Sequence, residues 1–272
     1  MLRKRGPMRP ITRKAPKALN RTVGPLLPSG LLARAYPQGR IHADDQMLRS
    51  DALEDVRHYF NTGPLTVAEI DDSLGLAGRR LDDVAACLVL PSGYGRVVCT
   101  LRDRLPATRI MAADVDGQAV RFCVHEFGVK GLVVPSAPLR VRFPDTYDLI
   151  FVGSLLTHLP AATCITLLKV LFGVLRMGGM LTFTTQGESC LAHLDWYGPE
   201  FVLAEGEFRR GLASDGVAFV PYRRRRDYGI TLHAQRYVER MMSEHFAGLV
   251  LLRFRDRGWN MHQDIWSYQR TA

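Results

Sequence analysis

The stretch Cys87-Leu88-Val89-Leu90-Pro91-Ser92-Gly93-Tyr94-Gly95-Arg96 decides the fold of this chain. Its first half is an apolar run typical of a buried strand, and Pro91 ends that run. Gly93 and Gly95 then supply a tight turn at which a ligand can approach bare backbone. Helical spacing follows up to Leu105. A strand, a glycine turn and a helix in this order predict the first unit of a Rossmann-like nucleotide-binding fold.

An acidic residue downstream supports this interpretation. Asp114 ends the next apolar run, roughly 20 residues after the glycines, where such folds hold ribose hydroxyls with a carboxylate. An NAD-binding fingerprint would place a third glycine three residues after Gly95, and that position is Val98. The spacing therefore disfavours a dinucleotide site.

Four segments carry a resemblance to a known family: Gly93–Gly95, Ala112–Asp116, Tyr147–Ser154 and Arg176–Phe183. In order and spacing they resemble the motifs of class I S-adenosylmethionine-dependent methyltransferases, over about residues 80–190. The resemblance implies S-adenosylmethionine as cofactor. It also implies a set of cofactor-binding residues: Pro91, Ser92, Gly93, Gly95, Asp114, Val115, Ser136, Ala137, Gly153 and Ser154.

The chain departs from the family pattern at three of its motif positions. Val89 stands where the family usually has an acid, Pro91 replaces the first motif glycine, and Ser136 replaces the acid that often follows the third strand. The expected carboxylate contacts with the cofactor are therefore reduced to Asp114.

We expect an α/β fold, a Rossmann-like seven-stranded and mostly parallel sheet with helices on both faces and an antiparallel C-terminal hairpin. Apolar runs predict five strands near residues 86–91, 109–114, 131–134, 148–153 and 180–185, and a closing hairpin at 249–254 and 264–268. Periodicity predicts helices at 44–60, 66–74, 161–176 and 234–246, with Asn61-Thr62-Gly63-Pro64 ending the first and Gly178-Gly179 capping the third.

The expected domain plan is a basic tail over residues 1–43 and a methyltransferase domain over 44–272, with an N-terminal helical cap at 44–80. An aromatic-rich insertion occupies residues 188–233 and interrupts the strand-helix alternation. In the resembled family such an insertion commonly builds the acceptor pocket. The alternative is a hydrophobic satellite that covers the sheet edge.

The charge is concentrated in the tail. The chain has 36 Lys and Arg against 27 Asp and Glu, and residues 1–43 hold ten of the bases and no acid. Such a composition, rich in Pro and Gly and without periodic apolar residues, predicts a disordered tail. Contact with nucleic acid or an anionic membrane is the first alternative, and a transit peptide is the second.

Deleting residues 1–28 is expected to leave the melting temperature within a few degrees of the full chain's, because the tail holds almost no periodic apolar residues. Thermal unfolding of the two proteins checks this, and a large drop would show that the tail packs on the folded body.

The composition of the chain indicates its cellular compartment and argues against a membrane span, disulfides and a metal site. The sequence contains no run of 18 apolar residues, so no membrane-spanning helix is expected. It also lacks an apolar segment near the N-terminus, so no secretory signal is expected. The five cysteines lie in apolar surroundings without a Cys-x-x-Cys pair, which indicates buried free thiols and a reducing cytoplasmic location. His193 and Asp195 are too few for a metal site, so no metal is expected.

Two histidines are candidate bases. Transfer of a methyl group to a hydroxyl needs a proton acceptor close to that hydroxyl. His158 follows the fourth predicted strand, whose carboxyl end faces the ligand crevice, and its segment is similar to one in sugar and natural-product O-methyltransferases. His262, in a polar turn between the last two strands, is the second candidate. For each, the alternative is a structural role, as a helix cap or in a plain hairpin turn.

The predicted function is O-methylation of a small molecule or glycan. Expected acceptor-binding residues are His193, Asp195, Trp196, Tyr222 and Arg223. Arg223 begins the run Arg223–Arg226, which could bind a phosphate or carboxylate; the alternative is that this run is only a solvated surface. Two alternatives stay open. One is a nucleic-acid methyltransferase that uses the tail and the arginine run, although the Asn/Asp-Pro-Pro-aromatic motif and any Pro-Cys dipeptide are absent. The other is a non-catalytic cofactor-binding protein.

Overall fold

A computed structural model describes residues 41–42, 44–48 and 53–272. The chain divides into two compact units, Met1–Asn61 and Thr62–Ala272. The predicted tail lies outside the described residues except for its last positions, 41 and 42. Within the first unit, Ile41, Leu48, Val56 and Tyr59 are buried together, and the Tyr59 hydroxyl donates to Asp45 Oδ2 over 2.5 Å.

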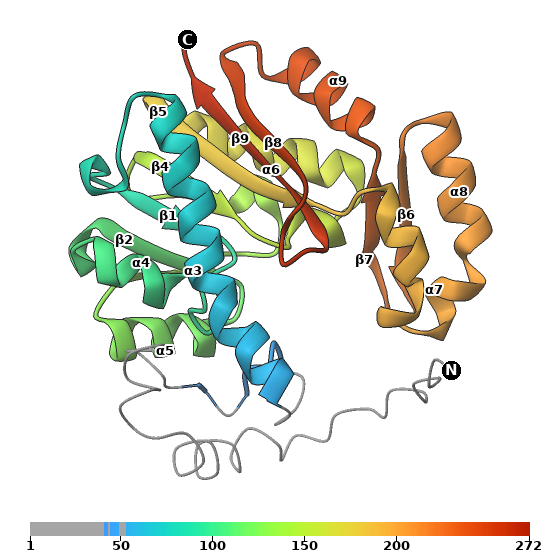
Figure 1. Ribbon diagram of the computed structural model, residues 1–272, viewed down its shortest axis with the longest axis horizontal. Helices are drawn as coiled ribbons and strands as arrows, with labels where there is room; N and C mark the ends of the chain where they lie inside the picture. The colour runs from blue at the N-terminus through green and yellow to red at the C-terminus, as the bar shows by residue number, and fades with distance from the viewer. Residues whose placement is uncertain (1–40, 43, 49–52) are drawn as a thin grey trace. The chain divides into compact units, whose positions relative to one another are not determined.

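The second unit is built on a seven-stranded sheet in the order β3-β2-β1-β4-β5-β9-β8, which confirms the expected fold class (Figure 1). The first five strands pair in parallel, and β9 pairs antiparallel with both β5 and β8. The strands are β1 (Cys87–Val89), β2 (Ile110–Asp114), β3 (Lys130–Val133), β4 (Tyr147–Val152), β5 (Leu175–Thr185), β8 (Leu249–Trp259) and β9 (Gln263–Arg270).

Helices cover both faces of the sheet because its central strands are apolar on both faces. Alternate residues of β1 enter two different cores: Leu88 lies among side chains of α6 (Ala161–Val174) and α9 (Gln235–His245). Cys87 and Val89 lie instead among side chains of α3 (Leu53–Leu76), α4 (Val98–Arg104) and α5 (Gly117–Phe127). This two-sided burial leaves the strand ends as the accessible part of the central sheet.

The expected helix break at Asn61–Pro64 was wrong, because α3 runs unbroken through Pro64. Its backbone comes so close to the first turn of α4 and the residues before it that a Cβ added at Gly63 would lie 2.3 Å from the Arg96 carbonyl oxygen and 2.4 Å from Thr100 Oγ1. One turn later, Thr66 Oγ1 donates to the Thr62 carbonyl over 2.6 Å and accepts from Trp259 Nε1 over 2.7 Å. These tertiary contacts outweigh the local signal for a break.

The expected cap at Gly178-Gly179 was also wrong. Helix α6 ends at Val174, and β5 starts at the next residue and runs through both glycines. Gly178 has φ +71°, and the register of β4 against β5 shifts between Tyr147 and Leu149. The two glycines therefore form an irregularity inside a strand, a position where glycine is common.

The stretch between β5 and α9 forms a group of its own, which we call the inserted unit (Figure 1). It consists of η5 (Glu188–Trp196), α7 (Pro199–Leu203), α8 (Glu205–Ser214) and the two-stranded hairpin of β6 (Val217–Tyr222) and β7 (Arg225–His233). It has a separate hydrophobic core, which includes Phe201, Phe208, Leu212 and Ile230. The inserted unit contacts the sheet domain through the short helix η4 (Leu156–His158), which follows β4.

All five cysteines are free, and four of them are buried, while Cys99 is half-buried. None of the helices in the described part of the chain is both long and apolar enough to cross a membrane.

Candidate active site

The glycine turn leaves open space beside its backbone. Ser92 N–H donates to the Ala113 carbonyl over 2.8 Å, so the turn is joined to β2 as soon as β1 has ended. Gly93 has φ +49°, and no atom lies within 4 Å of the position that a Cβ would occupy there. The open side of Gly93 is thus a place where a ligand can lie against bare backbone.

Gly95 faces the other way. It has φ +89°, and a Cβ would lie 2.4 Å from the Phe127 ring and 3.2 Å from Cys123 Sγ. Its lack of a side chain is required by the core between the turn and α5. Of the two glycines of the turn, Gly93 alone offers an open side to a ligand.

Asp114 joins the turn to the end of β2. One carboxylate oxygen accepts the Gly93 N–H over 2.8 Å, and the other accepts the Asp116 N–H over 2.9 Å. Burial raises the pKa of Asp114, and these two backbone hydrogen bonds oppose that rise. Each oxygen keeps a lone pair for a further donor, such as a ribose hydroxyl.

The other predicted cofactor residues lie at the same edge of the sheet, because neighbouring parallel strands end there together. Val115, directly after β2, exposes 59% of its surface, which is unusual for valine. Ser136 and Ala137 are exposed in the loop after β3, and Gly153 and Ser154 follow β4.

Ser154 is held in a left-handed conformation, with φ +55°. Its N–H donates to Thr184 Oγ1 over 2.8 Å, and its Oγ accepts from Gln263 Nε2 over 2.9 Å. Thr184 Oγ1 donates in turn to Gln263 Oε1 over 2.7 Å. Three strand ends thus share one polar network that stabilises a strained residue, and such strain is concentrated at functional sites.

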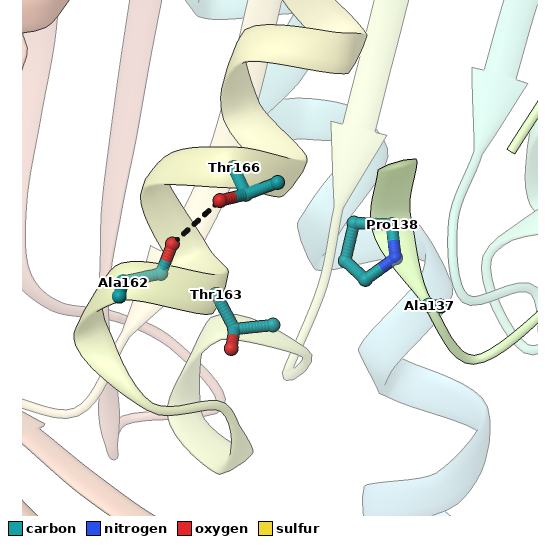
Figure 2. Close-up of a pocket in the computed structure, with 5 residues that line it drawn as sticks. All are labelled: Ala137, Pro138, Ala162, Thr163 and Thr166. Carbon is teal, nitrogen blue, oxygen red and sulfur yellow. Dashed lines mark hydrogen bonds between the residues drawn. The ribbon is translucent and has the colours of Figure 1, made fainter. Parts of the chain in front are cut away.

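A cavity of about 220 Å³ opens beside Ala137 (Figure 2). Pro138 lies across from Thr163, and Thr166 Oγ1 donates to the Ala162 carbonyl at the base of α6. The cavity borders the loop after β3, so Ala137 faces a hollow on one side.

His158 ends η4 and contacts the inserted unit. Its Nδ1 lies 2.8 Å from the Gly229 carbonyl oxygen, which cannot donate, so Nδ1 carries the proton and Nε2 has the lone pair. No described residue hydrogen-bonds Nε2. The ring stacks on Tyr228 with centroids 5.1 Å apart and on Tyr222 at 6.2 Å. Burial lowers the pKa of His158, although the Gly229 hydrogen bond opposes this, so the ring is neutral at physiological pH.

His262 lies in a second cluster, at the carboxyl end of β5. Gln186 Nε2 donates to the Tyr197 hydroxyl over 2.6 Å, which leaves the phenolic proton for His262 Nε2. Burial raises the pKa of Tyr197 and keeps the phenol protonated. The lone pair of His262 Nε2 is therefore already in use, unlike that of His158. Cys190 Sγ lies 3.9 Å from both nitrogens of the His262 ring.

Two of the predicted acceptor residues border this cluster. His193 stacks on Trp196 with centroids 4.3 Å apart, and Trp196 lies 5.0 Å from His262. Asp195 is exposed and contacts neither ring through any described interaction. Tyr222 belongs instead to the His158 stack, and Arg223 is exposed at the tip of the hairpin. The structure thus places His193 and Trp196 near His262 and Tyr222 beside His158, and it joins Asp195 and Arg223 to neither histidine through a described contact.

Several polar residues in the site were not singled out by the sequence. Thr184, Gln186, Tyr197 and Gln263 form the networks described above, and Tyr228 stacks on His158. The available signal was the polar run Thr184–Gln186, at the end of a predicted buried strand. Among the described residues, no three His, Cys, Asp or Glu side chains are placed to hold a metal ion.

Asp264 supplies a pH-dependent stability test. It is 4% exposed, and burial raises its pKa to about 6 although its Oδ1 accepts the Arg257 N–H. Because the folded-state pKa exceeds that of the unfolded chain, stability is lost as the pH rises from about 4 to about 6. Asp264→Asn keeps the acceptor oxygen and is expected to stabilise the fold at pH 7–8 by about 1–3 kcal/mol.

The melting temperature of Asp264→Asn and the parent chain, measured from pH 4 to pH 8, checks this expectation. The difference should shrink as the pH falls below 6. A difference independent of pH would show that Asp264 does not titrate in this range.

Comparison with known proteins places the fold. No protein-family profile and no curated protein sequence matches the chain. Solved structures do. The PH0226 protein from Pyrococcus horikoshii OT3 aligns with a TM-score of 0.56 at 14% identity, covering 88% of this chain and 98% of that one.

Two further solved structures, both of methyltransferases, align over most of this chain. Magnesium protoporphyrin IX methyltransferase from Synechocystis PCC 6803 was crystallised with bound SAH, which is S-adenosylhomocysteine, the demethylated cofactor. It aligns with a TM-score of 0.52 at 13% identity, covering 93% of this chain and 99% of that one. An O-methyltransferase family protein from Burkholderia thailandensis aligns with a TM-score of 0.50 at 14% identity, covering 90% and 70%. The sheet order, the glycine turn and these likenesses together show that the chain has the Rossmann-like fold of class I S-adenosylmethionine-dependent methyltransferases.

Proposed function

We propose that this protein is an S-adenosylmethionine-dependent methyltransferase that methylates an oxygen atom of a small molecule or glycan. The observation that carries the proposal is the 2.8 Å contact of His158 Nδ1 with the Gly229 carbonyl, which leaves Nε2 as a proton acceptor in a segment directly after β4. The shared fold of known methyltransferases supports it.

The residues of the glycine turn fit the cofactor. The open side of Gly93 accommodates a ligand against backbone, and the Asp114 oxygens have lone pairs left for ribose hydroxyls. The exposed Val115 offers an apolar surface to a purine ring. When bound, S-adenosylmethionine supplies an electrophilic methyl group on a positively charged sulfur. We propose that Pro91, Ser92, Ser136, Ala137, Gly153 and Ser154 complete this binding site at the strand ends, while Gly95, which the sequence also suggested, serves the packing of the turn on α5.

In this proposal His158 removes the proton of the acceptor hydroxyl. A neutral imidazole with a free Nε2 is in the correct state before the reaction, and its lowered pKa keeps it neutral at pH 7. After taking the proton the ring is a cation that burial disfavours. The Gly229 carbonyl and the faces of the Tyr228 and Tyr222 rings then stabilise that charge.

The other groups around the site have supporting roles. His262, whose Nε2 accepts from Tyr197, binds and orients the acceptor together with His193 and Trp196.

Two measurements test the function. Calorimetry measures binding of SAH to the full chain, and transfer of a labelled methyl group is followed with a panel of hydroxylated small molecules, glycans and RNA. Binding and transfer are both expected. SAH binding without transfer to any acceptor, RNA included, would favour a non-catalytic protein, and transfer to RNA alone would favour the nucleic-acid alternative.

Asp114→Ala is expected to weaken SAH binding by about 1.5–3 kcal/mol, which is roughly 10- to 150-fold in Kd. The carboxylate both binds the ribose and fixes the Gly93 N–H, so two effects add. Calorimetry measures the Kd, and the matched control is Asp116→Asn. That control removes a nearby negative charge but retains an amide that can cap α5, which Asp116 now caps. An unchanged Kd for Asp114→Ala would remove Asp114 from the site.

A further inference from the structure

The turn of the β6–β7 hairpin carries four consecutive arginines, Arg223 to Arg226, and all four are exposed. Asp227 is the one acid that pairs with them in the described structure, at 3.4 Å from Arg225. The other three arginines form no ion pair with any described residue. The turn is therefore a concentrated positive charge without matching counter-charges.

This charge adjoins the ring stack of the candidate active site. The Arg225 guanidinium lies 5.4 Å from the centroid of the Tyr228 ring, which stacks on His158. Burial raises the pKa of Tyr228, the positive charge of Arg225 lowers it, and the negative charge of Asp114 raises it further. Tyr228 thus lies within electrostatic reach of both the arginine turn and the carboxylate that we assign to the ribose.

The hairpin is fixed in this place at its base. Gly229 gives its carbonyl to His158, Thr231 Oγ1 donates to the Leu159 carbonyl over 2.6 Å, and His233 N–H donates to the Gln186 carbonyl over 2.7 Å. Gly229 also packs so closely that a Cβ would lie 2.1 Å from the Val220 carbonyl oxygen. These contacts hold the arginine turn at a defined position relative to His158, as a binding site requires.

We propose that the arginine turn recognises the acceptor, and that the acceptor carries a carboxylate or phosphate group beside the hydroxyl-bearing ring that is methylated. Arginine binds both anions through paired N–H donors, which orient them as well as attract them. The ring of the acceptor lies against Tyr228 and Tyr222, and its hydroxyl faces His158 Nε2. This inference rests on the proposed function and assigns its substrate class.

The test uses the full chain saturated with SAH and three matched probes: 4-hydroxybenzoate, 4-hydroxyphenyl phosphate and the neutral 4-hydroxybenzamide. Their Kd values are measured by calorimetry. The anionic probes are expected to bind at least about tenfold more tightly than the amide, on the scale of one charge-assisted hydrogen bond. The stronger of the two anionic probes identifies carboxylate or phosphate as the recognised group.

The variant Arg224→Gln/Arg226→Gln should remove most of this tenfold difference, and the matched control Arg121→Gln/Arg210→Gln, which deletes two exposed arginines elsewhere, should retain it. SAH affinity should be the same in all of these proteins. Equal binding of 4-hydroxybenzoate and 4-hydroxybenzamide to the SAH-bound chain would overturn the inference while the proposed function stands. Salt-dependent binding of single-stranded RNA through the same arginines would also overturn the inference, and it would favour the nucleic-acid alternative. Failure of the parent chain to bind SAH would overturn the proposed function itself, and this inference with it.

Discussion

Replacing His158 by asparagine is expected to slow methyl transfer by about 10²–10⁴-fold, the usual contribution of a positioned base. Asparagine Nδ2 can still donate to the Gly229 carbonyl, as Nδ1 of the histidine does, but it offers no lone pair at the position of Nε2. The variant therefore separates the base from the structural hydrogen bond. Turnover, SAH affinity and melting temperature are measured together, and only turnover should fall strongly.

The pH profile gives an independent readout of the same role. A base works in its deprotonated form, and the lowered pKa of His158 places its loss of activity on the acidic side of pH 6.5. The rate of the parent chain should therefore be level above that pH and fall below it, and the variant should lose this dependence. Near-normal turnover in the variant, or lost stability with intact turnover, would make His158 a structural residue and leave the role to His262.

The two glycines of the turn are expected to fail in different ways when each is replaced by alanine. At Gly95 the new methyl group would overlap the Phe127 ring at 2.4 Å and require φ +89°. Overpacking costs about 1–3 kcal/mol and left-handed backbone about 1–2 kcal/mol, so Gly95→Ala should lose about 2–5 kcal/mol of unfolding free energy.

At Gly93 the methyl group enters open space, so Gly93→Ala should lose only the backbone cost of about 1–2 kcal/mol. It should instead abolish SAH binding, because that space is the proposed cofactor site. Denaturant unfolding and calorimetry on the matched pair distinguish the two effects. Normal SAH affinity in Gly93→Ala would place the cofactor elsewhere.

The parallel strands were predictable from the sequence because each is a short apolar run with a turn signal at its end. Local signals misled where tertiary contacts outweigh them. Pro64 lies inside α3 because packing of Gly63 against the Arg96 backbone holds the helix together. Gly178 and Gly179 form an irregularity inside β5. In the sequence, two glycines after a helical segment look the same whether they cap the helix or lie in the strand that follows it.

The candidate site was predictable only in part. Residues that follow parallel strands meet at one edge of the sheet, so Asp114 and His158 could be singled out by position. Partners far apart in sequence could not. Nothing in the sequence pairs Tyr197 with His262 or His158 with Gly229, since 65 and 71 residues separate them. Those contacts place the proton of His158 on Nδ1 and engage the lone pair of His262 Nε2, and hence decide which histidine suits a base.

The separate core of the inserted unit has an evolutionary consequence. Residues from Cys190 to Ala234 bury their apolar side chains mainly among themselves and join the sheet through a few hydrogen bonds. Mutations that reshape this unit therefore cost little of the stability of the sheet. Under the function that we propose, in which this unit binds the acceptor, selection can exchange one acceptor for another while the strand ends that bind the cofactor stay unchanged, so a lineage with this architecture can diversify its chemistry without refolding its core.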